Sequence, residues 1–294
     1  MHLQQLIRRS AARCWRGLCG GLLAGVVSAE AADAGRVAWA DLLTSGVPAE
    51  EAVFYTKVLG WTMKQAGTAQ SPYVILSRAG RPVAGVAYRA AEAMGPARNR
   101  WLGFFSVEQP ATVAAKAEQA GGVVLMPARR WPGRGEQVVL ADGEGATFGL
   151  MQAVAGAAEG YGSWGWAALV ATTPEEEATF YAGLLGATVA DDTRTPMFSG
   201  DFLLSVGGRA AAGVTATPLQ AGRRAGWLWF VQVAEIDAVV RETERHGGRV
   251  LRKPGMDLMG GRLAVVADPR GAVFGLIEPT LEKIGAEKPL NPGK

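Results

Sequence analysis

Short apolar segments recur along the chain, and a helical pattern follows the first of them. Val37–Thr44 has the character of a strand. Pro48 with two glutamates close behind it is typical of the first turn of a helix, and Gly60 is typical of a helix end. Three further strands are predicted from short apolar runs between Gly, Pro and Ser residues: Thr62–Gln65, Tyr73–Ser77 and Val83–Tyr88. The predicted order is strand, helix, strand, strand, strand.

The same order begins again at Trp101–Val107. A helix is predicted at Pro110–Ala120, because Val113 and Ala117 recur at helical spacing and Gly121-Gly122 closes the segment. The three strands that follow it are predicted at Val123–Met126, Gln137–Ala141 and Thr147–Gln152. The first half of the chain therefore holds two units of the same kind.

The second half of the chain repeats the first. Pro48–Tyr55 (PAEEAVFY) recurs 126 residues later as Pro174–Tyr181 (PEEEATFY). The same interval separates several other pairs: Trp101-Leu102 and Trp227-Leu228, Gly121-Gly122 and Gly247-Gly248, Ala141-Asp142 and Ala267-Asp268, and Phe148-Gly149-Leu150 and Phe274-Gly275-Leu276. Ile236–His246 is the second helix of the second copy. The sequence therefore predicts an α+β protein of four βαβββ modules.

An export signal is expected at the N-terminus. Residues 1–31 combine four arginines, an apolar run at Leu18–Val27 that is too short to span a bilayer, and an Ala29-Glu30-Ala31 cleavage site. We therefore expect a periplasmic or secreted protein without a membrane span after cleavage; a retained anchor is the alternative. The predicted ranges are a signal peptide at 1–31, a first domain at 36–153, a linker at 154–162, a second domain at 163–280 and a tail at 281–294.

Removal of this leader changes the charge of the chain and the chemistry available to it. The leader holds four of the 30 basic and one of the 27 acidic residues, so 26 of each remain. Both cysteines and His2 leave with it, and His246 is then the only histidine. A neutral, cysteine-free chain does not support nucleic-acid binding, thiol chemistry or a His-rich metal site. A structural role at the end of its helix is expected for His246.

Four segments carry a resemblance to a known family. They are Trp39–Thr44 (WADLLT), Phe54-Tyr55, Leu59-Gly60-Trp61 and Asp268–Gly275 (DPRGAVFG). Together with the repeat, they make residues 36–279 similar to the vicinal oxygen chelate superfamily, which includes glyoxalase I, bleomycin-resistance proteins and extradiol dioxygenases. The resemblance implies two tandem domains, each with two modules that pair into one cupped sheet around a site.

The resemblance also implies where a metal would be bound. Members that use a metal carry His, Gln or Glu ligands on the first, fifth and eighth strands. In this sequence those positions fall on residues that are not ligands: Trp39 and Trp166, Leu102 and Leu228 (or Trp101 and Trp227, one residue earlier), and Gly149 and Gly275. We therefore expect no cofactor and no bound divalent metal.

Aromatic residues remain as candidates for a ligand cup. If Ala40 and Leu42 face the helix, strand alternation places Trp39, Asp41 and Leu43 in the cup. The other candidate ligand contacts are Leu102, Phe104 and Gly149, with Tyr73 and Trp131 as a cover, and Trp166, Phe230 and Gln232 in the second cup. Gly149 and Gly275 are expected to leave room where a metal-bound Glu would stand, and Arg129-Arg130 is a candidate rim. Core packing is the alternative for each tryptophan, and a solvated face for the two arginines.

Asp41 is the polar residue that we single out. It is expected to accept a hydrogen bond from a ligand, to pair with a cationic ligand, or to act as a catalytic base. The alternative is a structural aspartate paired with a nearby arginine. The second copy has Ala168 at this position, so the two cups are not equivalent.

Three hypotheses about function follow. The leading one is an exported, metal-independent protein that binds an aromatic or apolar small molecule. The second is an enzyme of the glyoxalase or dioxygenase type with an atypical site. The third is a partner-binding scaffold, and a homodimer is left open.

Overall fold

The computed structural model describes residues 34–91, 99–131, 134–152, 162–191, 202–216, 225–256 and 261–279. The predicted signal peptide, all of the predicted linker except Gly162, and the predicted tail lie outside these residues. Within the described ranges, no helix combines the length and the apolar character that crossing a membrane requires.

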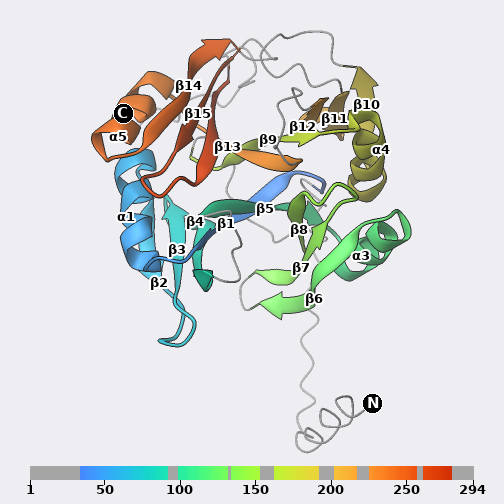
Figure 1. Ribbon diagram of the computed structural model, residues 1–294, viewed down its shortest axis with the longest axis horizontal. Helices are drawn as coiled ribbons and strands as arrows, with labels where there is room; N and C mark the ends of the chain where they lie inside the picture. Colours follow the sequence, from blue (N-terminus) through green and yellow to red (C-terminus); the bar gives the residue numbers. More distant parts are fainter. Residues whose placement is uncertain are drawn as a thin grey trace, which may run out of the picture. The chain divides into compact units, whose positions relative to one another are not determined.

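Four βαβββ modules follow one another along the chain, as the repeat predicts (Figure 1). The first two modules are β1 (Val37–Thr44), α1 (Pro48–Leu59), β2 (Thr62–Gln65), β3 (Tyr73–Arg78), β4 (Arg81–Tyr88), β5 (Arg100–Val107), α3 (Pro110–Gln119), β6 (Val123–Trp131), β7 (Gly135–Ala141) and β8 (Thr147–Gln152). The last two are β9 (Trp164–Ala171), α4 (Pro174–Leu185), β10 (Thr188–Asp191), β11 (Phe202–Val206), β12 (Arg209–Ala216), β13 (Gly226–Gln232), α5 (Ile236–Arg245), β14 (Arg249–Met256), β15 (Arg262–Ala267) and β16 (Val273–Glu278).

Consecutive modules pair into two eight-stranded sheets. The first sheet has the order β2-β3-β4-β1-β5-β8-β7-β6, and the second has the order β10-β11-β12-β9-β13-β16-β15-β14. In each sheet, the first strands of its two modules, β1 with β5 and β9 with β13, run antiparallel at the centre. Each of them also runs parallel to the last strand of its own module. The predicted α+β fold of two tandem domains is therefore confirmed.

Local sequence explains where the elements begin and end. Proline occupies the first turn of α1, α3 and α4, where a missing backbone N–H costs nothing. Gly60 ends α1 in the left-handed region, with φ of 67°. His246 follows the last residue of α5 and pairs with Glu242 at 3.4 Å, which agrees with the structural role expected for it.

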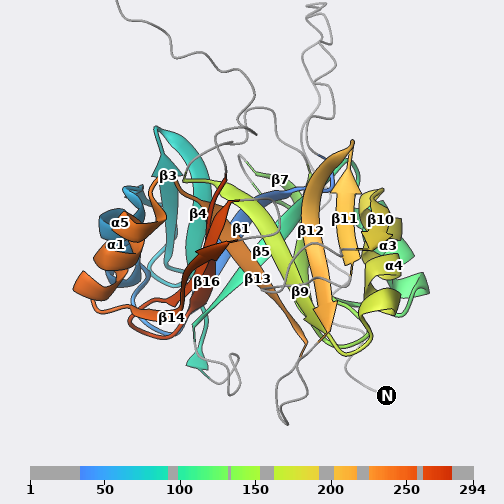
Figure 2. The ribbon, with the colours of Figure 1, turned by 90° about the horizontal axis from the view of Figure 1, so that it is seen from above.

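The two sheets contact each other through the faces that carry the helices. Helix α1 of the first domain packs beside α5 of the second, and α3 packs beside α4 (Figures 1 and 2). Between the sheets, the Trp229 ring lies so close to Gly103 that a Cβ there would sit 2.3 Å from it. The ring centroids of Phe105 and Trp227 are 5.1 Å apart, and those of Trp101 and Trp164 are 5.0 Å apart. Aromatic packing of this kind makes one continuous core of both domains.

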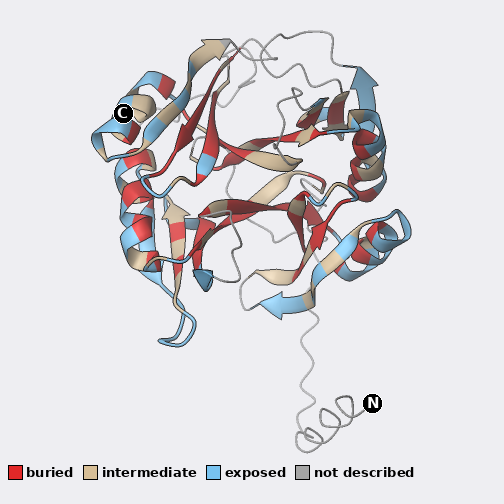
Figure 3. Ribbon diagram, viewed as in Figure 1, coloured by how far each residue is buried: buried red, intermediate tan, exposed pale blue. Residues whose placement is uncertain are grey.

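Burial follows this arrangement. Figure 3 shows that buried residues gather on the central strands and on the inner sides of the helices. The edge strands β2 and β10 are exposed along their whole length. The concave face of each sheet therefore belongs to a surface separate from the shared core.

Two matched hydrogen bonds join the domains inside that core. The Tyr55 hydroxyl of α1 donates to Asp268, in the turn between β15 and β16, at 2.9 Å. The Tyr181 hydroxyl of α4 donates to Asp142, in the turn between β7 and β8, at 2.7 Å. Burial raises the pKa of both aspartates. Each domain thus gives one tyrosine and one aspartate to the contact.

The carboxyl groups around these two contacts differ. Burial and the nearby charges of Asp142 and Glu144 raise the pKa of Glu177 to about 8. At the equivalent place Glu51 forms an ion pair with Arg270, although burial still raises the pKa of Glu51. Arg270 occupies the repeat position of Glu144, so one contact contains a cation where the other contains a carboxylate.

Candidate ligand-binding site

The concave face of each sheet carries its own apolar cluster. The first cup is lined by Trp39, Leu102, Phe104 and Met151, with Ala38, Leu43, Ile75 and Val139 packed against them. The second cup is lined by Trp166, Ala168, Leu203, Phe230, Leu263 and Ile277, with Ala210 and Leu228 packed against them. Ala40 and Leu42 lie in the shared core on the opposite face of β1. The strand alternation that places Trp39 and Leu43 in the cup is therefore confirmed.

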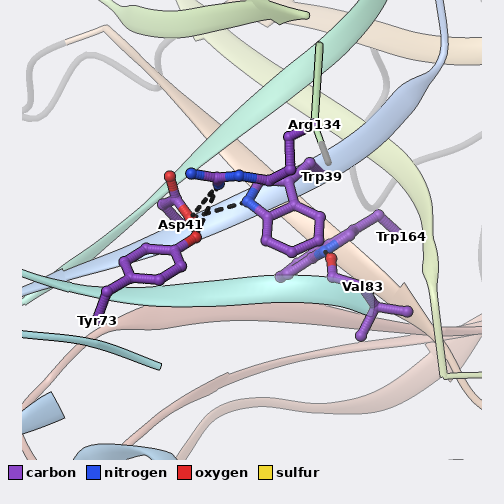
Figure 4. A network of polar contacts seen from close by, with 6 residues as sticks. All are labelled: Trp39, Asp41, Tyr73, Val83, Arg134 and Trp164. Carbon is purple, nitrogen blue, oxygen red and sulfur yellow. Dashed lines mark hydrogen bonds and ion pairs between the residues drawn. The ribbon is translucent and has the colours of Figure 1, made fainter. Parts of the chain in front are cut away.

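Asp41 is the centre of a polar network in the first cup. Its Oδ1 atom accepts hydrogen bonds from Trp39 Nε1 at 2.8 Å and from the Tyr73 hydroxyl at 2.6 Å. Arg134 Nη1 lies 3.5 Å from the same oxygen and donates to the Tyr73 hydroxyl at 2.8 Å (Figure 4). Burial and the charge of Asp41 raise the pKa of Tyr73, so this phenol stays protonated and remains a donor. The network fixes all four side chains relative to one another.

Arg134 also lies among three aromatic rings. Its guanidinium carbon is 5.2 Å from the ring centroid of Trp39, 5.0 Å from that of Tyr73 and 5.4 Å from that of Trp131. Distances of this size give cation–π attraction, which is stronger where water is excluded. The side chain of Arg134 is 15% exposed and that of Asp41 is 12% exposed. The cup thus presents a flat, positioned guanidinium at its polar end.

Gln137 is a second polar residue on this face. It lies on β7 opposite Met151 and two residues before Val139, both of which belong to the cup cluster. The residue is only 2% exposed. Its Nε2 atom is buried and has no hydrogen-bond partner among the described residues. A buried donor without a partner costs about 1–3 kcal/mol, and a ligand acceptor at this atom would remove that cost.

The second cup lacks this polar end in the residues that the structure describes. Ala168 replaces Asp41, and Leu263 stands at the register position of Gln137, opposite Ile277. Both Ala168 and Leu263 belong to the apolar cluster of that cup. The predicted inequality of the two cups is confirmed by these positions.

The chain matches two known family models. Residues 164–276 match the model of the Glyoxalase/Bleomycin resistance protein/Dioxygenase superfamily, and residues 41–151 match that of a glyoxalase-like domain. The protein belongs to the glyoxalase/bleomycin resistance protein/dioxygenase superfamily. The resemblance to the vicinal oxygen chelate proteins that the repeat indicates is thereby confirmed.

A curated superfamily relative matches most of the chain. The anthracycline biosynthesis protein DnrV of Streptomyces peucetius is 31% identical over 265 residues, which cover 83% of this chain and 93% of that protein. The two proteins therefore share both tandem domains.

Two solved structures show the same superfamily fold. The Mn(II)-bound glyoxalase from Novosphingobium aromaticivorans aligns with a TM-score of 0.62 and 15% identity, over 84% of this chain and 82% of that chain. The 2,2',3-trihydroxybiphenyl 1,2-dioxygenase from Sphingomonas wittichii aligns with a TM-score of 0.58 and 15% identity, over 84% of this chain and 93% of that chain. At this identity the likeness concerns the fold alone.

The metal that some superfamily members use does not fit the residues of either cup. Trp39 and Leu102 occupy two of the expected ligand positions in the first cup, and Trp166 and Leu228 occupy them in the second. None of these side chains offers a metal-binding nitrogen or oxygen. Among the described residues, no group of three or more His, Cys, Asp or Glu side chains is placed to hold a metal ion.

The third expected ligand position is occupied by Gly149 and Gly275, and the structure corrects the expectation that these glycines leave open room. A Cβ at Gly149 would lie 2.1 Å from the Phe104 ring, and one at Gly275 would lie 2.0 Å from the Phe230 ring. The space above each glycine is therefore filled by a phenylalanine from the neighbouring parallel strand and is not open room.

The structure brings most of the predicted cup residues together. Trp39, Asp41, Tyr73 and Trp131 meet around Arg134, and Leu102 and Phe104 lie in the same cup. In the second cup, Trp166 and Phe230 lie in the apolar cluster, and Gln232 is half-buried opposite Ile277. Arg129 and Arg130 are exposed on β6, as a rim or a solvated face requires.

Sequence reasoning missed two residues of the site. Arg134 comes from the turn before β7 and is isolated among glycines in the sequence, so nothing in its surroundings marks it. Gln137 carries a usable signal, because it lies two residues from Val139 and strand alternation therefore places it inside the cup.

Proposed function

We propose that this protein binds an aromatic small molecule in its first cup without a metal ion. The observation that carries the proposal is the network in which Asp41 and Arg134 hold Trp39 and Tyr73 in place. A preorganised group of aromatic and polar side chains against an apolar wall is the chemistry of a small-molecule site. The poor fit of the cup to a metal supports the metal-free part of the proposal.

The curated relative supports an aromatic ligand. Anthracyclines are fused-ring aromatic compounds, and the Streptomyces relative is named for their biosynthesis. A flat ring is suited to contact aromatic side chains such as Trp39 and Tyr73. The relative's name describes that protein, and for this chain it supports only the class of ligand.

Calorimetric titration with 2-acetylnaphthalene tests the proposal on the purified full chain. We expect saturable binding to protein that elemental analysis shows to be free of transition metals. Trp39→Ala is expected to weaken binding about tenfold or more, since an aromatic contact of this kind contributes roughly 1–3 kcal/mol. The matched variant Trp166→Ala alters the second cup and is expected to leave the affinity within about twofold.

Two results contradict the proposal. One is the absence of saturable binding by the folded wild-type chain up to the solubility limit of the compound. The other is a stoichiometric transition metal whose removal abolishes binding. Circular dichroism of both tryptophan variants ensures that a loss of binding is not a loss of fold.

An enzyme with Asp41 as its base is a second candidate. Asp41 uses Oδ1 for its contacts, and Oδ2 makes no hydrogen bond to a described residue. A carboxylate with one oxygen available in a cup is suited to remove a proton next to a carbonyl group. Proton NMR in D₂O would show exchange of the methyl protons of 2-acetylnaphthalene, and Asp41→Asn would abolish it. If exchange does not exceed the rate in buffer, the enzyme candidate is contradicted and binding remains as the proposed function.

Export is part of the same proposal and rests on residues 1–31 of the sequence. Cell fractionation followed by intact-mass measurement tests it. A periplasmic or secreted form that begins after Ala31 supports export, and a full-length cytoplasmic form contradicts it.

A further inference from the structure

Hydrogen-bond donors that have no partner among the described residues lie at the start of β7, in the first cup. Arg134 immediately precedes β7, and Gln137 lies in it. Gln137 Nε2 is buried and has no partner among the described residues. Arg134 directs Nη1 to Tyr73 and Asp41, whereas its Nη2 and Nε atoms make no hydrogen bond to a described residue. Both side chains belong to the concave face, so a ligand held in the cup would meet these donors.

In contrast to these donors, the acceptors of the cup are largely occupied by hydrogen bonds within the cup. Asp41 Oδ1 already accepts two hydrogen bonds and faces Arg134, so Oδ2 is the oxygen of this carboxylate that remains available. The Tyr73 hydroxyl accepts one hydrogen bond and donates one. The Arg134 guanidinium lies within cation–π distance of three rings, two of which, Trp39 and Tyr73, are drawn in Figure 4, and these contacts help to hold it in place. The cup therefore offers more oriented donors than acceptors to a ligand.

The geometry points to an aromatic carbonyl compound as the ligand of the first cup, with Arg134 and Gln137 as the residues that recognise its carbonyl oxygens. This inference rests on the proposed function, because it names the ligand class of the same site. An aromatic ketone, quinone or carboxylate presents acceptor oxygens at the edge of a flat ring. Its rings would contact Trp39 and Tyr73 while its oxygens meet the guanidinium and the buried amide.

The second cup provides the internal comparison. Leu263 stands where Gln137 stands in the first cup, and Ala168 stands where Asp41 does. Neither offers a hydrogen bond. At these two positions the same sheet geometry thus presents polar side chains in one copy and apolar side chains in the other.

Two nearly isosteric ligands test the inference. 2-Acetylnaphthalene carries a carbonyl oxygen, and 2-isopropenylnaphthalene replaces that oxygen by a methylene group. We expect wild-type protein to bind the ketone about tenfold or more tightly than the hydrocarbon in calorimetric titrations, because the hydrocarbon leaves the donors unpaired. Gln137→Leu and Arg134→Met are expected to bring this ratio close to one, mainly by weakening the ketone.

The controls separate recognition from folding. Gln137→Leu removes a buried donor without a partner, so its thermal midpoint is expected not to fall. Arg134→Lys keeps the charge but loses the planar fork, and is expected to lower the ratio without unfolding the cup. Leu263→Gln, the reciprocal change in the second cup, is expected to leave the ratio unchanged.

The outcomes distinguish this inference from the proposed function. If neither compound binds, the proposed function fails. If both bind wild-type protein equally well, the proposed function stands and the carbonyl inference is overturned. A preference for the ketone that survives in both Gln137→Leu and Arg134→Met also overturns it.

Discussion

The hydroxyl of Tyr181 donates a 2.7 Å hydrogen bond to Asp142, and so ties a helix of the second repeat to a turn of the first. Trp227 Nε1 donates to the same hydroxyl at 2.9 Å, which makes Tyr181 both donor and acceptor inside the core. Because Tyr55 and Asp268 form the reciprocal contact, the domains are joined twice by the same motif.

The first prediction concerns that contact. Tyr181→Phe removes two hydrogen bonds, the one to Asp142 Oδ2 and the one from Trp227 Nε1. Because these buried groups then lack the hydroxyl as a partner, we expect the free energy of unfolding to fall by about 1–3 kcal/mol. Urea denaturation measures the change. Tyr88→Phe alters an exposed tyrosine and serves as the control, with an expected effect below about 0.5 kcal/mol. Equal effects for the two variants would contradict the buried role.

The second prediction concerns pH. The pKa of Glu177 rises from 4.5 to about 8 on folding because burial and the charges of Asp142 and Glu144 disfavour its ionised form. The folded state then binds more protons than the unfolded state between these values, so this contribution to stability falls as pH rises from 4.5 through 8. Glu177→Gln is expected to flatten the stability profile in that range and, at pH 9, to exceed wild-type stability by about 1 kcal/mol.

Glu51→Gln is the matched variant for that experiment. Glu51 has Arg270 as an ion-pair partner, so its replacement is expected to lower stability at pH 9 instead of raising it. If both variants change the free energy of unfolding at pH 9 in the same direction, the presence of Arg270 in one contact and Glu144 in the other does not explain how these carboxyl groups affect stability.

The third prediction concerns the glycine beneath Phe104. Gly149→Ala places a Cβ 2.1 Å from a ring carbon, and we expect the resulting displacement to lower stability by about 1–3 kcal/mol. Gly183→Ala is the control, because no atom lies within 4 Å of its Cβ and alanine favours its helix. Thermal denaturation of both variants is expected to give changes of opposite sign. An unchanged Gly149→Ala protein would contradict the close contact.

The fourth prediction concerns the ion pair of the cup. Asp41→Asn removes the charge that faces Arg134 and is expected to destabilise the protein by about 1–3 kcal/mol, since both side chains are largely buried. Asp237→Asn breaks an exposed pair with Arg262, which solvent and salt screen, and is expected to have a smaller effect. Chemical denaturation at low and high salt compares the two. A larger effect for Asp237→Asn would contradict the central place of Asp41.

Apolar runs and turn residues account for how well the fold is predicted from sequence. Val37–Thr44 and Thr147–Gln152 are found with their observed limits, because each is a mainly apolar run next to turn residues. β6 is predicted to end at Met126 but continues to Trp131, because Pro127 and two register shifts interrupt the pattern without ending the strand. The sequence therefore did not indicate that β6 extends far enough to place Trp131 beside Arg134.

The contacts between the domains could not be predicted from the sequence, for a physical reason. Tyr55, Asp142, Tyr181 and Asp268 all lie in repeated segments, so their importance is visible. A repeat alone does not tell whether a helix packs on a turn of its own domain or of the other one. That choice depends on the curvature of the two sheets and on the helix pairs α1–α5 and α3–α4, which are tertiary features.

The alternation of side chains across each sheet has a consequence for how such proteins diverge. In β1, Ala40 and Leu42 belong to the shared core, while Trp39 and Asp41 belong to the cup. A substitution at Trp39, Asp41 or Leu43 is therefore expected to alter what the cup recognises and to leave the association of the domains intact. The cups of the two copies can therefore differ, as they do at Asp41 and Ala168, while both copies keep the face that forms the shared core.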